Sequence, residues 1–171
     1  MSEIKDTDWA YAAGFVDGEG CIAITRSFSA PRNRFYYGVC VVAVNRERAV
    51  LDWMKDYWAG WVVAMPHAGG NARRSWAWRS PKGTSAERFL RGIRPWLRIK
   101  GAQCENALKM IEVLKRSRYT LGRNALPADW LLDQENLYWQ QRELNHRGSL
   151  EYEAKAMHSP RRIHRERLAC N

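Results

Sequence analysis

Residues 12–20, AAGFVDGEG, limit how this chain can fold more than any other stretch of its sequence. Apolar residues at helical spacing predict a short helix here, with Thr7 or Asp8 as its N-cap and the following glycines as its end. Gly14 and Gly18 lie one turn apart, so one face of this helix carries almost no side chain. Another backbone can therefore approach that face closely.

Two acids stand at the predicted end of this helix. Asp17 and Glu19 would lie at its C-terminus, where the helix dipole is negative and an acidic side chain costs a few tenths to about 1 kcal/mol. Helix stability therefore does not explain why these residues are acidic. We expect a partner of positive charge at this end.

The composition favours one domain that binds a polyanion. With 171 residues and 46% apolar content, the chain can bury one sizeable core. A formal charge of +10 and a pI near 9.8 give the excess of Lys and Arg that a nucleic-acid-binding surface needs. Nucleic acid is therefore the leading partner.

The cysteines and histidines do not form a metal-binding or disulfide pattern. No C-x-x-C pair occurs, so we expect reduced cysteines and an intracellular protein. The N-terminus lacks the apolar region of a signal peptide, and no run approaches the roughly 20 apolar residues of a membrane span. We therefore expect a soluble protein without a membrane partner. The residues concerned are Cys21, Cys40, Cys104, Cys170, His67, His146, His158 and His164.

Helical and strand patterns alternate along the rest of the chain. Alternating residues 21–28 and the β-branched, aromatic residues 35–44 predict a hairpin around a turn at 29–34. A helix over 46–58 with Asn45 as N-cap, a second hairpin around Gly69 and Gly70, and later helices follow. One of these later helices begins with a capping box, Thr84 and Glu87, and Pro95 ends it.

The predicted fold class is α+β, with helices on one face of an antiparallel sheet and the other face free. We assign residues 1–126 to a core of order α-β-β-α-β-β-α, and residues 127–150 to a C-terminal helix. Residues 151–171 form a basic tail. A solvated, flexible end is the default interpretation of this tail, and added contact with phosphate is the alternative.

The stretch AAGFVDGEG resembles the LAGLIDADG motif of homing endonucleases. Ala13, Gly14, Asp17 and Gly20 match identically, and Glu19 stands where the family has an acid. The resemblance covers about residues 7–118, because VNRERAVLDWMKDYWAG and RPWLRIKGAQ also resemble family segments. It implies a concave sheet that lies on the major groove of DNA, and it implies that the chain carries one motif and pairs with a second copy.

The resemblance assigns roles to the residues of the motif. Ala13, Gly14 and Asp17 would lie in a homodimer interface, where two copies of Glu19 meet. At an effective dielectric near 20, two such charges about 5 Å apart repel by roughly 3 kcal/mol. A divalent cation answers this repulsion, and Glu19 with the Gly18 carbonyl offers the hard oxygen ligands that Mg²⁺, or Mn²⁺, takes.

Two further residues are candidates for catalysis. Lys100 matches the family's active-site lysine, which would stabilise charge near the scissile phosphate; the alternative is an ordinary basic surface residue. Asn45 matches a polar position that orients solvent, and its alternative role is the N-cap. These residues, with Glu19, would hydrolyse phosphodiester bonds at bound metal.

We expect DNA bases to be read by the strand faces opposite the core, where Arg pairs with guanine and small side chains contact other bases. A slip of one residue in the fourth strand would instead present Arg74, Trp76 and Trp78. The DNA-binding candidates are Ala23, Thr25 and Ser27; Arg32, Arg34, Tyr36, Gly38 and Cys40; and Arg73, Ser75 and Arg79.

The sequence thus predicts a site-specific double-strand DNA endonuclease that acts as a metal-dependent homodimer on a long, roughly palindromic site. The alternatives are a DNA-binding protein that does not cleave, and an RNA maturase that assists intron splicing, for which RNA would be the partner. Intact acidic and lysine positions favour the endonuclease, because a pure binder has no use for a repulsive pair of acids.

Overall fold

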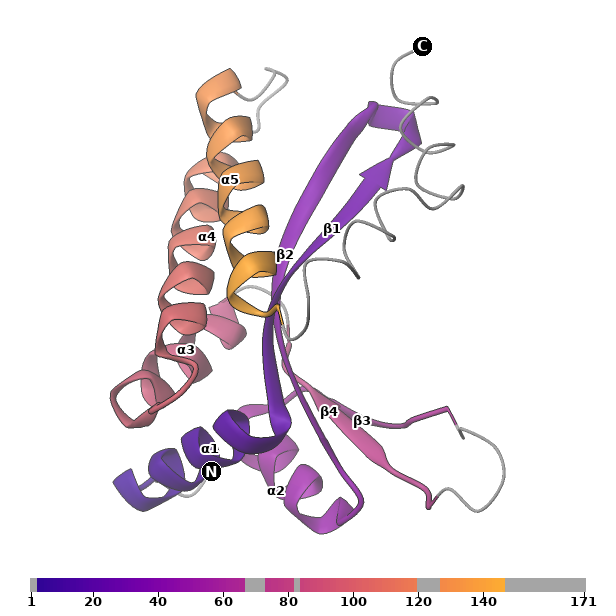
Figure 1. Ribbon diagram of the computed structural model, residues 1–171, viewed down its shortest axis with the longest axis vertical. Helices are drawn as coiled ribbons and strands as arrows, with labels where there is room; N and C mark the ends of the chain where they lie inside the picture. The colour runs from indigo at the N-terminus through magenta and orange to yellow at the C-terminus, as the bar shows by residue number, and fades with distance from the viewer. Residues whose placement is uncertain (1–2, 67–72, 82–83, 120–126, 147–171) are drawn as a thin grey trace. The chain divides into compact units, whose positions relative to one another are not determined.

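The structure is a computed structural model that describes residues 3–66, 73–81, 84–119 and 127–146. The chain divides into two compact units. The first comprises residues 1–26 and 37–145 and holds the helices α1 to α5 and most of the sheet (Figure 1). In the second unit, the described residues are the hairpin segment Ser27–Tyr36 and His146. The predicted tail, residues 151–171, and the Gly69–Gly70 turn lie outside the described residues.

Helix α1, Asp6–Glu19, begins earlier than predicted and ends where predicted. Lys5 occupies the N-cap position, so neither Thr7 nor Asp8 is the cap. Asp8 lies inside the first turn, where its carboxylate accepts the backbone N–H of Lys5 at 3.0 Å. Gly20 follows the last residue, Glu19, and donates its N–H to the carbonyl of Val16.

Four strands form one sheet in the order β1-β2-β4-β3. They are β1 (Gly20–Ser29), β2 (Arg34–Asn45), β3 (Trp61–Ala64) and β4 (Trp76–Arg79). Ile22 and Ile24 of β1 are buried, whereas Cys21 before them and Thr25 after them are exposed. The burial of these two residues is that of the predicted core face, but Phe28, further along the same face, is 46% exposed.

The facing of β4 follows the first of the two predicted arrangements. Trp78 is fully buried and its ring packs against Phe89 at 5.1 Å, so Trp78 faces the core. Arg79 is the next residue and therefore faces the other way. The strand is shorter than predicted, because it begins at Trp76, so Arg73 and Ser75 precede it rather than lie within it.

The remaining helices pack around a core that includes Val16, Ile22, Leu51, Trp78 and Phe89. Glu47 is the N-cap of α2, so the prediction of Asn45 as its cap was wrong. None of the helices in the described ranges is long and apolar enough to cross a membrane. The helices are α2 (Arg48–Trp58), α3 (Thr84–Ile93), α4 (Gly101–Tyr119) and α5 (Ala128–Leu144), with a 3₁₀ turn, η2 (Arg94–Trp96), at Pro95.

None of the three described cysteines, Cys21, Cys40 and Cys104, forms a disulfide with another described residue. Cys104 is buried in α4, where its Sγ donates to the carbonyl of Leu90 at 3.4 Å. Burial raises the pKa of this thiol to about 11, so it stays protonated at neutral pH.

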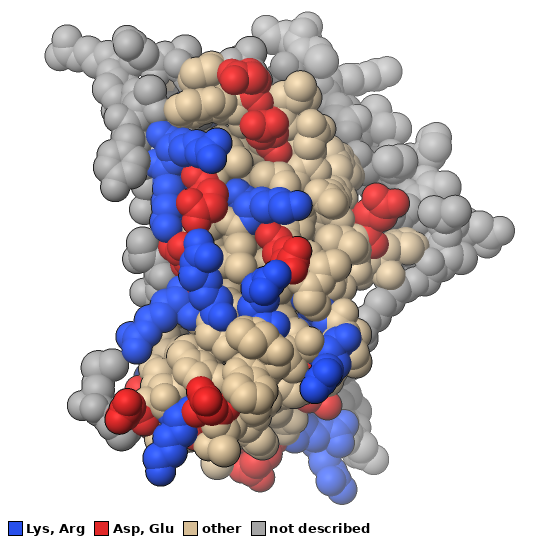
Figure 2. All heavy atoms as spheres, turned by 90° about the vertical axis from the view of Figure 1, so that its left-hand side faces the viewer, with Lys and Arg blue, Asp and Glu red and all other residues tan. Residues whose placement is uncertain are grey.

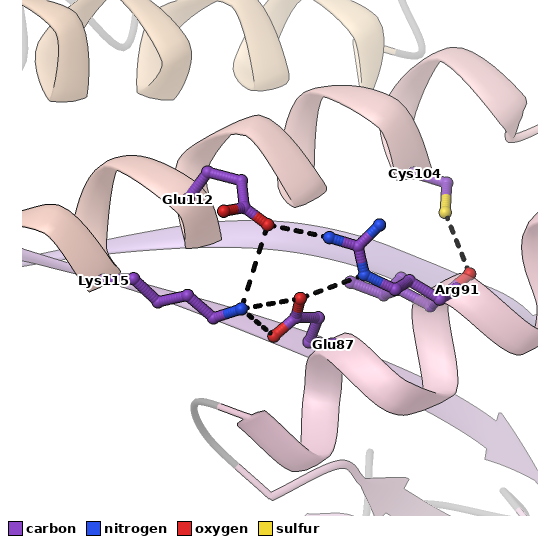
Figure 3. Close-up of polar contacts among 6 residues, drawn as sticks. Glu87, Arg91, Cys104, Glu112 and Lys115 are labelled. Carbon is purple, nitrogen blue, oxygen red and sulfur yellow. Dashed lines mark hydrogen bonds and ion pairs between the residues drawn. The ribbon is translucent and has the colours of Figure 1, made fainter.

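Charged side chains join α3 to α4 (Figure 3). The carboxylate of Glu87 accepts from Arg91 at 3.0 Å and from Lys115 at 2.7 Å, and Arg91 also reaches Glu112 at 2.7 Å. Thr84, the other member of the predicted capping box, has a side chain outside the described ones, so the observed partners of Glu87 are these two cations. The hydrogen bond from Lys115 is the main cause that lowers the pKa of Glu87, and Arg91 adds to it.

Replacing Glu87 with Gln should lower the free energy of unfolding at pH 7 by about 1 to 3 kcal/mol, because two cations lose a nearly buried partner. A lowered folded pKa contributes stability above the unfolded value near 4.5 and loses it as the pH falls through the folded value. The difference in unfolding free energy between parent and variant should therefore disappear in acid. Urea unfolding at several pH values would measure it. Glu105→Gln is the matched control, because its half-exposed pair with Arg94 should contribute at most about 1 kcal/mol.

Candidate active site at the end of α1

Asp17 fastens the end of α1 to the loop that precedes α4. Its carboxylate accepts three backbone N–H groups, from Arg98 at 2.7 Å, Ile99 at 3.2 Å and Lys100 at 2.9 Å. Three such bonds satisfy a carboxylate that is only 8% exposed. This clamp explains one of the two acids at the helix end: Asp17 organises a loop that lies more than 80 residues away in the sequence.

The side chain of Lys100 is held against the same helix end. It is 4% exposed, and its Nζ donates to the backbone carbonyl of Asp17. A cation at a helix C-terminus is favourable because the free carbonyls there carry partial negative charge. The structure therefore brings Lys100 to the turn that ends in Glu19, although nothing in the sequence spacing links the two.

The exposed side of α1 is narrower than predicted. Gly14, Gly18 and Glu19 are exposed, and a Cβ atom added at either glycine would meet no atom within 4 Å. Ala13 and Asp17, which were predicted to lie in the same interface, are buried within the chain. Their side chains belong to the core and to the loop clamp, so the bare surface consists of the row through Gly14 and Gly18.

Two apolar side chains that the sequence analysis missed are exposed close to the clamp. Ile99 is 69% exposed, and its backbone N–H binds Asp17; Trp96 of η2 is 40% exposed. Large apolar side chains are seldom left in water beside one another without a partner. Both residues lie in the short connection between Pro95 and the start of α4. That position was the signal from which their exposure could have been predicted.

Asn45 lies at the end of β2, next to Trp76 of β4 in the sheet register. Its Oδ1 accepts the backbone N–H of Glu47 at 2.8 Å and so stabilises the turn that leads into α2. The Oδ1 of Asn45 is thus used in a local turn. Its Nδ2 group can still donate to a ligand.

Three predicted DNA-binding residues of the first unit have partners in the sheet. Thr25 donates from its Oγ1 to the carbonyl of Gly38 at 3.1 Å, so these two residues face each other across the hairpin. Arg79 is flanked in the register by Val42 and Trp61. Apolar residues therefore lie on both sides of Arg79 in the sheet, which the sequence analysis did not foresee. The side chain of Arg32 lies outside the described ones.

The helical face drawn in Figure 2 has a different character. Lys and Arg are interspersed there with Asp and Glu. On α3, η2 and α4 the ion pairs include Arg91 with Glu112 and Arg94 with Glu105, so opposite charges neutralise one another. A mixed surface of this kind attracts a polyanion weakly.

The donors at the end of α1 suit a hard divalent cation. Glu19 offers an exposed carboxylate, and Gly18 precedes it with an exposed backbone position. The described part of the chain holds no cluster of three or more His, Cys, Asp or Glu that could bind a metal by itself. One or two carboxylates are what Mg²⁺ takes from a protein when phosphate and water complete its shell. The residues present therefore fit a cation shared with another chain and with a phosphate.

This architecture, a small-residue helix that ends in an acid and leads into a four-stranded antiparallel sheet, is the fold of the LAGLIDADG homing endonucleases. It matches the homing endonuclease I-CvuI in complex with its target in the presence of Ca, with a TM-score of 0.67 and 19% identity over 84% of this chain and 85% of that one. It also matches the archaeal intron-encoded homing endonuclease I-Vdi141I complexed with DNA, with a TM-score of 0.66 and 15% identity over 84% and 87% of the two chains.

A third structure has a longer chain. The LAGLIDADG meganuclease I-AabMI bound to uncleaved DNA matches with a TM-score of 0.56 and 18% identity, over 86% of this chain but 48% of that one. No model of a protein family matches the sequence, and no curated protein matches it. The likeness at these identities establishes the fold, which confirms the α+β class and the order of the core elements predicted from the sequence.

Proposed function

We propose that the protein is a metal-dependent, site-specific double-strand DNA endonuclease that acts as a homodimer on a long, roughly palindromic site. The observation that carries this proposal is the end of α1, where an exposed Glu19 follows a bare glycine row and a buried Lys100 is fastened beside it. The solved proteins with this fold are homing endonucleases, and several are bound to DNA. Their common fold supports the same activity here.

The surface of α1 supports a homodimer. The row through Gly14 and Gly18 lets a second α1 approach about a two-fold axis. Trp96 and Ile99, in the segment that leads to the Asp17 clamp, add exposed apolar surface. This chain matches about half of the I-AabMI chain. That ratio supports a dimer of this protein as the counterpart of the single, longer I-AabMI chain. Pairing brings two Glu19 carboxylates together, and the cost of their repulsion is the reason to expect a cation between them.

Each residue of the site has a task in hydrolysis. Glu19 and the Gly18 carbonyl of both protomers would hold Mg²⁺ or Mn²⁺, which when bound supplies a Lewis acid and an acidic water. Lys100 places a positive charge where the phosphate accumulates negative charge, and its burial strengthens that interaction. Asp17 keeps Lys100 in place, and Asn45 is available to orient solvent.

The test is to incubate the protein with a randomised duplex library and Mg²⁺, and to sequence the molecules that are cut and those that are retained. We expect cleavage at one nearly symmetrical sequence, with no cleavage in EDTA. A library that is retained but never cut would instead assign the protein to the binders that do not cleave, and retention of RNA over duplex DNA would point to a maturase.

Arg34 should determine one base of the site. Its Nε donates to the hydroxyl of Tyr36 at 2.7 Å and its guanidinium lies 4.5 Å from the centre of that ring, so the side chain is held in one orientation. The two terminal nitrogens then form a fork suited to guanine O6 and N7. Arg34→Gln should erase a guanine preference at one position of each half-site, at about 1 to 3 kcal/mol, in a binding selection.

The alternative for Arg34 is a phosphate contact, and the same selection separates the two. A phosphate contact would weaken binding to all sequences alike and reduce the salt dependence by about one ion per protomer. Tyr36→Phe is the matched variant, because it keeps the ring and removes the hydroxyl; it should weaken the guanine preference without changing binding to unrelated DNA.

A further inference from the structure

The two proposed active-site residues each stand directly before another element. Glu19 is followed by β1, which begins at Gly20, and Lys100 is followed by α4, which begins at Gly101. The positions of β1 and α4 therefore determine where Glu19 and Lys100 lie. A contact that ties β1 to α4 will constrain the two residues relative to each other, even at a distance from them.

Helix α5 provides such a tie through a relay of side-chain amides. Asn106 of α4 donates from its Nδ2 to the Oε1 of Gln141 at 2.9 Å, and Gln141 donates from its Nε2 to the backbone carbonyl of Ile22 in β1 at 2.7 Å. Asn145 donates to the same carbonyl at 2.7 Å. Ile22 is three residues beyond Glu19, and Asn106 is six residues beyond Lys100.

The side-chain amides of Gln141 and Asn106 in this relay are buried. Gln141 is 1% exposed and Asn106 is 3% exposed, so their amide groups depend on protein partners rather than on water. β1 is the edge strand among the four described strands, so its outer side pairs with none of the others. The amides of Gln141 and Asn145 take the place of a neighbouring strand and fix β1 just after the active-site turn.

We propose that Gln141 is a positioning residue for catalysis. By joining β1 to α4, it sets the relative placement of Glu19 and Lys100. The Asp17 clamp joins the end of α1 to the loop before α4, so two separate sets of hydrogen bonds constrain Glu19 and Lys100. This inference rests on the proposed endonuclease function. It also gives α5, a helix outside the sequence motif, a part in the reaction.

The test replaces Gln141 with Met, which fills a similar volume and makes neither hydrogen bond. Single-turnover cleavage at saturating DNA and Mg²⁺ should fall about 10- to 100-fold, the range for groups that orient active-site ligands from outside, while DNA binding stays unchanged. Hydrogen exchange of the segment 19–24 should become faster. A variant that is fully folded, cuts at the parent rate and exchanges as the parent does would overturn the proposal.

Two further variants separate positioning from stability. Asn106→Leu combined with Gln141→Met removes both amides of the relay and should recover thermal stability, because no buried donor is left unpaired, yet cleavage should stay low. Gln103→Met is the matched control: Gln103 donates to the carbonyl of Leu144 at 3.0 Å, an α4–α5 bond of the same kind that does not reach β1. It should lose stability without slower cleavage by the folded protein.

The exchange measurement keeps this inference apart from the proposed function. If the parent protein cuts no sequence in the library, the endonuclease proposal fails, and the exchange rates of segment 19–24 still show whether Gln141 holds β1. If the parent cuts and the double variant recovers the full cleavage rate together with its stability, Gln141 has only a structural role and the proposal is overturned.

Discussion

Glu19→Gln should reduce DNA cleavage by about a thousandfold or more while the protein still binds its site tightly and in a salt-dependent way. The substitution keeps the size of the side chain and its exposed position at the end of α1, and it removes the charge on which a hard cation depends. Binding depends on the sheet and on basic side chains elsewhere, so it should survive. Cleavage is measured on the selected duplex, and binding by a gel-shift titration.

The dependence of binding on divalent ions gives a second readout of the same residue. In metal-free buffer, two Glu19 carboxylates at the axis oppose dimerisation by roughly 3 kcal/mol, so Ca²⁺ should strengthen DNA binding by the parent. Glu19→Gln has no such repulsion and should bind equally well with and without Ca²⁺. Cleavage by this variant at the parent rate would remove Glu19 from the metal site.

Glu105→Gln is the control for charge alone. Glu105 is a half-exposed acid on α4 whose partner is Arg94, and its removal changes the net charge by the same amount. We expect it to cut at the parent rate and to keep the parent's response to Ca²⁺. A loss of cleavage in this control would mean that net charge, rather than a particular carboxylate, governs the reaction.

The sequence predicted the elements of the fold well because local patterns determine them. The alternation over Ile22 and Ile24, and the glycines after α1, are signals within a few residues of the structure they specify. The tie between Asp17 and the backbone of Lys100 spans 83 residues, and no periodicity carries information over that distance. The position of Lys100 was therefore predicted by the resemblance alone.

The faces of α1 show where a periodic pattern loses resolution. Ala13 and Asp17 form one row along the helix, and Gly14 and Gly18 form the adjacent row, about 100° further round. Small residues in both rows predicted one wide interface, but the boundary between buried and exposed surface runs between the rows. Which of the two rows is buried depends on how the whole chain packs against α1.

The buried amides of α5 escaped prediction for a related reason. Polar residues are normally assigned to the surface, and Gln141 is almost fully buried because Asn106 and Ile22 satisfy its hydrogen bonds. Those partners lie on two other elements. The helix was therefore predicted from the sequence, and the burial of Gln141 was not.

Gly14→Leu should abolish both the homodimer and cleavage while leaving the single chain folded. A Cβ atom added at this position meets no atom packed against the helix within 4 Å, and Leu is a better helix former than Gly by nearly 1 kcal/mol. The isolated protomer should therefore be at least as stable. In the dimer, the same side chain would stand where the second α1 backbone approaches, so the two helices could not meet.

Sedimentation separates these effects. The parent should sediment with twice the single-chain mass of 19.9 kDa, and Gly14→Leu with that mass itself. The unfolding midpoint of the parent should rise with protein concentration, as expected when association is coupled to folding, whereas that of the variant should not depend on concentration. Binding to the full site should fall to that of one half-site, and cleavage should be lost, because a single Glu19 cannot complete the metal site.

Two controls decide whether the contact between glycine rows is the cause. Gln140→Leu adds the same side chain at an exposed position of α5 and should remain dimeric and active. Gly20→Ala lies six residues from Gly14, but its Cβ would come within 2.8 Å of the Val16 backbone, so it should destabilise the chain itself. A Gly14→Leu protein that stays dimeric and cuts DNA would show that the protomers pair through another surface, and the two Glu19 residues would then have no reason to share a cation.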